Sequence, residues 1–278
     1  MTTALLTLLA LVAFAANSIF ARLALGGSSI DAASYTAVRL LMGAATLWLI
    51  ARFRRTVAEA PTGGNWTSAA MLFLYAAMFS FAYVKLTTGT GALILFAAVQ
   101  ITMIAVGLHR GERPSVRHWV GLATAITGLV YLVAPGVTAP SLTGSLLMGT
   151  AGVGWGVYSL VGRGVTNPVQ ASTGNFIRTV PFALITLIPW SSSLAITAEG
   201  FLWASLSGSL TSAIGYVIWY AALPRLSATL AATVQLLVPA LAALGGVVFL
   251  SERMTLRLFV SGTMILTGVG LAILGRRK

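Results

Sequence analysis

The chain has 278 residues and a formal net charge of +12, yet only 8% of its residues are charged and 58% are hydrophobic. A soluble globular domain carries about 25% charged residues, so the composition excludes that class and indicates a membrane protein. The basic residues lie in short loops and at the C-terminus rather than in one patch, so nucleic acid is not an expected partner. Cysteine is absent, which excludes disulfides and thiolate metal sites, and no metal or cofactor is expected.

Apolar segments long enough to cross about 30 Å of hydrocarbon recur along the whole chain. They lack the strict apolar–polar alternation of barrel strands, which predicts α-helices. We therefore predict an all-α polytopic membrane protein with ten transmembrane helices. Their expected bounds are 4–22, 32–52, 67–85, 88–108, 116–134, 141–161, 171–190, 199–221, 226–249 and 256–275. The first segment lacks the positively charged start of a signal peptide, so we interpret it as a retained helix.

Lysine and arginine are distributed unequally between the two sides of this predicted bundle. With the N-terminus in the cytoplasm, eleven of the 17 lie in inner loops and the C-terminal tail. Four lie in outer loops, namely Arg22, Lys85, Arg253 and Arg257. The positive-inside rule therefore predicts a multi-pass protein of the bacterial inner (plasma) membrane with both termini in the cytoplasm.

The second half of the chain repeats features of the first at an offset of about 140 residues. The run "ERPSVRHWVGLATAITGLVYLV" at 112–133 returns as "ERMTLRLFVSGTMILTGVGLAI" at 252–273. We predict one five-helix repeat at 1–138 and a second at 139–278, divided where prolines and a glycine interrupt the helices. Because each repeat has an odd number of spans, the two are expected to be inverted in the bilayer, with a site at their interface.

Only five carboxylates are present, and none falls near the middle of a predicted span. Asp31 is expected to cap the second helix, with Gln170 in the corresponding place of the second half. Glu112 and Glu252 are each expected to pair locally with the arginine that follows. A proton relay normally needs a buried titratable group, so tight proton coupling has little support. Two loop histidines without a buried acid also make a poor catalytic set, which argues against an enzyme.

Arg39 and Arg178 are the basic residues that fall inside predicted helices, at matched positions of the two halves. A buried arginine is costly and is usually paired or faces a cavity. One interpretation is that these residues bind an anionic group of a substrate. The interpretation we prefer is that they bond carbonyl ends of neighbouring helices and brace each half.

Polar and aromatic side chains in the middle of several spans could line a cavity. Pro239 lacks an N–H, which frees the carbonyl of Gln235 in mid-span, although a neighbouring hydroxyl could also heal such a kink. Trp155 lies deep in the sixth span among glycines that permit close helix approach, whereas tryptophan and tyrosine elsewhere often mark the interfacial belt. The predicted substrate-binding residues are Asn17, Tyr83, Gln100, Trp155, Tyr158, Tyr216, Trp219 and Gln235.

These features together resemble the drug/metabolite transporter (DMT) superfamily, and specifically its paired EamA-type repeats. The resemblance covers essentially the full chain. It rests on the ten spans, the second-helix arginine of each half, the Glu-Arg turns followed by "GLATAITGLVYL" and "SGTMILTGVGLA", and the late "VQLLVPALAAL". Within the superfamily the chain is similar to the YddG-like amino-acid exporters, which implies efflux of aromatic and other neutral amino acids through a central cavity. The chain departs from the family pattern in carrying Asn17 where a first-helix tryptophan is common.

We therefore predict a secondary transporter that exports small metabolites, amino acids foremost, by alternating access between two inverted repeats. The alternative within transport is efflux of drug-like or other small organic solutes. A cationic solute would lack counter-charge, because the predicted spans contain no central acid. The alternatives from other classes are a membrane-embedded enzyme and a non-transporting scaffold.

Overall fold

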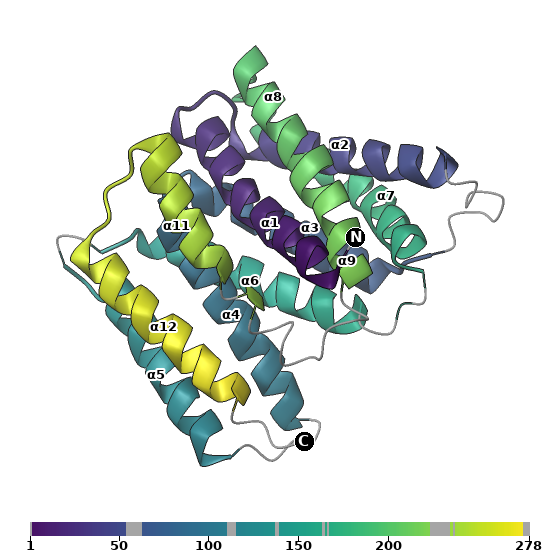
Figure 1. The fold of residues 1–278 in the computed structure, drawn as a ribbon. Helices are drawn as coiled ribbons and strands as arrows, with labels where there is room; N and C mark the ends of the chain where they lie inside the picture. The colour runs from purple at the N-terminus through teal and green to yellow at the C-terminus, as the bar shows by residue number, and fades with distance from the viewer. Residues whose placement is uncertain are drawn as a thin grey trace.

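The computed structural model describes residues 2–53, 63–109, 115–136, 139–162, 165, 167–222, 234–235 and 237–274. Within these ranges the chain is helical throughout its regular structure, apart from one isolated bridge between Ile30 and Ile196 (Figure 1). The elements are α1 (Thr3–Gly26), α2 (Ala32–Phe53), α3 (Trp66–Tyr83), α4 (Thr88–His109), α5 (Val116–Val133), α6 (Leu142–Gly162), α7 (Pro168–Leu187), η2 (Ile188–Trp190), α8 (Ala198–Leu206), η3 (Ser207–Ile214), α9 (Gly215–Ala222), α11 (Leu237–Leu250) and α12 (Leu256–Leu274).

Each predicted span coincides with helix wherever the structure describes it. The ends differ most at α1, which continues to Gly26, and at α7, which already begins at Pro168. The span predicted at 199–221 is built from α8, η3 and α9 in succession, and η3 is a π-helical segment. Such wide turns within α-helices occur frequently at functional sites.

Part of the ninth predicted span lies outside the described residues, and so does Glu112. The described α11 begins at Leu237, two residues before Pro239. The kink that we expect to free the carbonyl of Gln235 therefore stays a prediction.

Several helices meet the requirements of a membrane span. Five segments are both long and apolar enough to cross a bilayer, namely α1, α2, α3, Pro168–Trp190 and Ala198–Ala222. Shorter apolar stretches occur in α4, α5, α11 and α12. Large apolar side chains such as Leu146, Val248 and Phe249 are exposed on the outer surface of the bundle. Such exposure is favourable in lipid and unfavourable in water, which confirms the all-α polytopic membrane fold.

The helices pack in a pattern that is unchanged when the two halves are exchanged. α5 packs along α12 and α2 along α7, and these are matched spans of the two predicted repeats (Figure 1). The sixth span, α6, packs on α3 and α4, and the first span, α1, correspondingly packs on α8–η3–α9 and on α11. This is the pairing expected of two repeats related by a two-fold axis.

Asp31 caps α2 as predicted, because its Oδ1 accepts the N–H of Ser34 at 2.9 Å. Its Oδ2 accepts the N–H of Ala195 at 2.9 Å, which ties the α1–α2 connection to the segment before α8. Partial burial opposes ionisation, but the hydrogen bonds from Ser34 and Ala195 outweigh it and lower the pKa of Asp31. The expected correspondence with Gln170 is wrong. Asn167 caps α7 instead, three residues before Gln170, because the helix begins at a proline that follows it.

Candidate functional site

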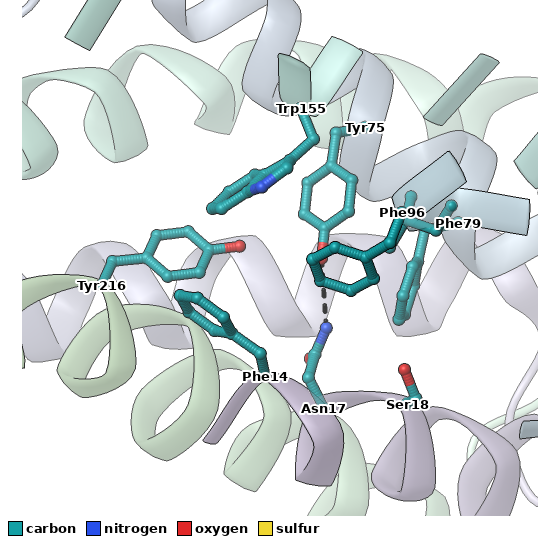
Figure 2. Close-up of a pocket in the computed structure, with 9 residues that line it drawn as sticks. Phe14, Asn17, Ser18, Tyr75, Phe79, Phe96, Trp155 and Tyr216 are labelled. Carbon is teal, nitrogen blue, oxygen red and sulfur yellow. Dashed lines mark hydrogen bonds between the residues drawn. The ribbon is translucent and has the colours of Figure 1, made fainter. Parts of the chain in front are cut away.

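A small cavity of about 20 Å³ lies in the centre of the bundle, between α1, α3 and α4 of the first half and α6 and α9 of the second (Figure 2). One side of it is polar and the rest is mostly aromatic. It is lined by Phe14, Asn17, Ser18, Tyr75, Phe79, Leu95, Phe96, Trp155 and Tyr216.

Asn17 forms the centre of the polar side. Its Nδ2 donates to the hydroxyl of Tyr75 at 3.2 Å (Figure 2). Its Oδ1 accepts from the hydroxyls of Ser207 and Thr211, at 2.7 and 3.1 Å. Both of these donating hydroxyls belong to residues of η3. A buried amide needs such partners, and Asn17 thereby joins α1, α3 and η3 around the cavity.

Arg39 lies directly behind this polar side and is only 1% exposed. Its Nε donates to the Ser212 hydroxyl and its Nη2 to the Tyr75 hydroxyl, each at 3.1 Å. The guanidinium also lies 4.8 Å from the ring centroid of Phe79. Within the part of the chain that the structure describes, Nη1 has no hydrogen-bond partner and no carboxylate pairs with Arg39. A positive charge without a counter-charge therefore stands next to the cavity.

The two matched arginines differ in their partners. Arg178 donates to the carbonyl of Gly63 at 2.9 Å and lies over the ring of Trp66. A carbonyl partner is as expected, but this carbonyl precedes α3 and does not belong to the carbonyl end of a helix. The expectation of carbonyl partners is wrong for Arg39, which donates instead to hydroxyl groups of α3 and η3. The repeat therefore keeps the position of the arginine but not its surroundings.

Trp155 dominates the aromatic wall. Its ring centroid lies 4.8 Å from that of Tyr216, 5.0 Å from that of Tyr75 and 6.0 Å from that of Phe14. Rings at such distances pack favourably in tilted and edge-on arrangements. The wall therefore combines side chains of α1, α3, α6 and α9.

Glycines on α6 set the position of Trp155. A Cβ at Gly152 would lie 2.5 Å from the Cβ of Ala98 on α4, and a Cβ at Gly154 would lie 3.0 Å from the Met71 carbonyl oxygen on α3. Only glycine permits such close approach, which confirms the role predicted for the glycines around Trp155.

The structure brings some of the predicted site residues to the cavity and leaves others behind it. Those that line it are Asn17, Trp155 and Tyr216. Three others lie one layer back, each packed on a lining ring: Trp219 on Phe14, Tyr158 on Trp155 and Tyr83 on Phe79. Gln100 and Gln235 are buried but are not among the lining residues. Whether any of the eight binds substrate stays a prediction.

Sequence reasoning missed Phe14, Ser18, Tyr75, Phe79, Leu95 and Phe96. A signal for some of them exists, because Tyr75, Phe79 and Tyr83 recur every four residues and so share one face of α3. Leu95 and Phe96 give no comparable signal, since apolar residues in a membrane helix can face lipid equally well.

At one end of the bundle an ion pair is combined with a helix cap, and we call this arrangement the Arg22–Glu252 clasp. Arg22 Nε lies 3.3 Å from Glu252 Oε1, and Arg22 Nη1 donates to the Tyr83 carbonyl at 3.0 Å. Glu252 also accepts from the backbone N–H and the hydroxyl of Thr88, at 2.9 and 3.2 Å, where α4 begins. The expected local pairing of Glu252 with Arg253 is therefore wrong. The first N–H groups of a helix lack intrahelical partners and attract a carboxylate, and Glu252 serves this purpose for α4.

The EamA-like transporter family matches residues 142–274, which is the second predicted repeat. The chain is 47% identical to the uncharacterized protein PA1977 of Pseudomonas aeruginosa, over 99% of this chain and 95% of that protein. It is 30% identical to the threonine/homoserine exporter RhtA of Escherichia coli, over 63% of this chain and 60% of the exporter. The structure also resembles the crystal structure of a protein that is 21% identical in sequence. The match covers the whole of this chain and the whole of that protein with a TM-score of 0.69, which shows a shared fold. The chain belongs to the EamA-like transporter family, within the drug/metabolite transporter superfamily.

Proposed function

We propose that this membrane transporter exports neutral amino acids by alternating access through the central cavity. The observation that carries the proposal is the composition of that cavity, which combines a polar side next to the unneutralised charge of Arg39 with a wall of aromatic rings. The similarity to an exporter of threonine and homoserine supports the same substrate class.

Each part of a zwitterionic amino acid has a suitable partner in the cavity. The hydroxyl of Tyr75 accepts hydrogen bonds from both Asn17 and Arg39, so its own proton is available to a carboxylate. The charge of Arg39 favours the same carboxylate in a medium of low dielectric. No acidic side chain lines the cavity, so the ammonium group is held by the faces of rings such as Trp155 and Tyr216. A cationic drug would find no counter-charge there and would meet the repulsion of Arg39.

The cavity must enlarge before it can hold an amino acid. About 20 Å³ is little more than the space needed for one water molecule. We infer that the structure represents an occluded state and that the Arg22–Glu252 clasp breaks when the cavity opens toward that end of the bundle.

We further propose that the halves 1–138 and 139–278 are inverted repeats and that both termini face the cytoplasm of a bacterial cell. The exchange-symmetric packing of the helices supports the first point, and the eleven-to-four distribution of basic residues supports the second. A reporter fused after Lys278 should be active only as a cytoplasmic reporter. Activity as a periplasmic reporter would contradict this orientation.

The test of function is counterflow in liposomes that contain the purified protein. Labelled threonine and phenylalanine should exchange, whereas choline should not. Tyr75→Phe removes the hydroxyl that joins Asn17 and Arg39 and should lower the exchange rate at least tenfold. Tyr131→Phe, on the exposed face of α5, should exchange at the wild-type rate.

Equal rates in both variants would show that the central cavity is not the substrate site. Exchange of choline without amino acids would reject the proposed substrate class. Absence of exchange for every solute in a panel of amino acids and drug-like molecules, with folded protein, would favour the scaffold.

A further inference from the structure

A second pocket lies at the end of the bundle that carries the α3–α4, α5–α6 and α11–α12 connections. Its volume is about 240 Å³, far larger than that of the central cavity, and segments of both halves line it. This volume is enough for a small organic molecule, although the pocket is smaller than the roughly 300–1,000 Å³ of drug-sized sites.

Three basic residues line this pocket, namely Lys85, Arg253 and Arg257. Within the described ranges the Arg22–Glu252 clasp is the only ion pair, so none of the three has an acidic partner there. Glu252 does not neutralise its neighbour Arg253, because its carboxylate oxygens are engaged by Arg22 and by the start of α4. The lining contains no acidic residue.

The N-terminal ends of three helices also lie at this pocket. Thr87 and Thr90 lie at the start of α4, Ser141 immediately precedes α6, and Thr255 immediately precedes α12. The last two cap their helices: Ser141 accepts from the N–H of Gly144 and Thr255 from the N–H of Leu258. The N-terminus of α4 is already occupied by the Glu252 carboxylate. The N-termini of α6 and α12 each carry about half a positive charge, which adds to that of the three basic side chains.

The positions of these basic residues are informative. The predicted topology places four basic residues in the outer loops, and three of the four line this one pocket. The positive-inside rule depletes that face of lysine and arginine, so topology does not account for the cluster. A binding role for the cluster accounts for it.

We propose that this pocket, which we call the anion pocket, binds the carboxylate or phosphate group of a small molecule at a site separate from the central cavity. Lys85 and Arg253 attract the oxyanion, and the hydroxyl of Thr90, which accepts from that of Thr87 at 2.9 Å, donates a hydrogen bond to it. Arg257 is held in place by the carbonyl of Ala134, to which it donates, and contributes its charge. A dissolved anion and the phosphate of an anionic lipid present the same chemistry to this pocket.

The experiment measures binding of inorganic phosphate to the purified protein by calorimetry at low ionic strength. Binding should be detectable for the wild type and at least tenfold weaker for the double variant Lys85→Gln/Arg253→Gln. The matched control is Arg52→Gln, which removes an exposed charge at the end of α2 and should change the affinity less than twofold. A parallel arm measures by native mass spectrometry how much phosphatidylglycerol each variant retains after extraction in detergent.

Phosphate binding that depends on Lys85 and Arg253 establishes a site for dissolved anions. Retention of phosphatidylglycerol that depends on the same two residues, without phosphate binding, establishes a site for lipid phosphate. If neither depends on them, the proposal is wrong. Should the double variant fail to fold, Thr87→Cys in the otherwise wild-type chain gives a second measurement, because the protein has no cysteine of its own. Phosphate or added phosphatidylglycerol, but not chloride at equal ionic strength, should slow its reaction with a maleimide, and a rate unchanged by both would also overturn the proposal. Neither readout requires transport, so failure of the export proposal would leave this one standing.

Discussion

We predict that the Arg22–Glu252 clasp stabilises the occluded state relative to a state that is open at the same end of the bundle. Glu252→Gln keeps an amide oxygen that can accept from the N–H of Thr88, but it removes the charge that attracts Arg22. The two side chains are only 12% and 21% exposed, so solvent screens the pair weakly. A hydrogen bond to a charged group contributes about 1.5–3 kcal/mol. Loss of about 2 kcal/mol should raise the ratio of open to occluded protein about thirtyfold.

The absence of cysteine allows this ratio to be measured with a single introduced thiol. Ser18→Cys places the thiol on the cavity wall, at a position that is 2% exposed in the occluded state. In lipid nanodiscs, its rate of reaction with a polar maleimide should rise about thirtyfold when Glu252→Gln is added. Glu199→Gln is the control, because Glu199 lies at the exposed start of α8, where it accepts from the indole of Trp203.

Unfolding would also expose the thiol, so a second reporter is needed. Ala183→Cys on α7 is fully buried and should stay unreactive in the Glu252→Gln background. A rate at Ser18→Cys that changes less than threefold would refute the role of the clasp. An equal rise with Glu199→Gln, or reaction at Ala183→Cys, would show that the effect is not specific to this end.

Three further predictions address packing, the polar side of the cavity and pH. Gly152→Ala should lower the yield of folded protein in gel filtration, because overpacking of this kind costs about 1–3 kcal/mol. Gly149→Ala on the same helix should not lower it, because no neighbouring atom lies within 4 Å of the place that its Cβ would take. Equal yields would contradict the close approach of α4 and α6. Asn17→Asp places a negative charge where the substrate carboxylate is proposed to bind, so the rate of counterflow should fall at least tenfold. Thermal unfolding, followed by tryptophan fluorescence, should still show a folded protein. Undiminished exchange would place the carboxylate elsewhere. Folding lowers the pKa of Asp31, so its contribution to stability is fully present above the ordinary value of 3.8 and is lost as the pH falls through the lower folded value. The difference in unfolding temperature between the wild type and Asp31→Asn should therefore be largest near neutral pH and shrink below about pH 4. A difference that is independent of pH would refute the lowered pKa of Asp31.

The positions of the helices could be predicted from the sequence because lipid imposes a simple requirement. A span must be apolar over a fixed length and must satisfy its own backbone, so length and composition locate it. The close helix packing at the glycines around Trp155 could also be predicted, since few other residues permit two helices to approach so closely. The partner of Glu252 could not be predicted, because Arg253 is adjacent in sequence whereas Arg22, which binds it, is 230 residues away. The π-helical turn of η3 also has no distinct sequence pattern, yet it decides which hydroxyls reach Asn17 and Arg39.

The cavity wall shows how a repeated scaffold can serve an asymmetric substrate. Phe14 and Trp155 are 141 residues apart, and so are Tyr75 and Tyr216, so four lining rings occupy matched positions of the two halves. An amino acid has a carboxylate at one end only, and a fully symmetric site could not distinguish its ends.

The chain breaks the symmetry at the polar positions. Asn17 lines the cavity, whereas its counterpart Tyr158 lies one layer back, behind Trp155. Arg39 is buried beside the cavity, whereas its counterpart Arg178 binds the carbonyl of Gly63 at the entry to α3. Both halves thus supply the aromatic walls. In the proposed function, the charge that orients a carboxylate comes from the first half alone. Arg39→Gln should remove the carboxylate preference, so that an amino-acid amide competes in counterflow as well as the parent amino acid, and a retained preference would show that the orienting charge lies elsewhere.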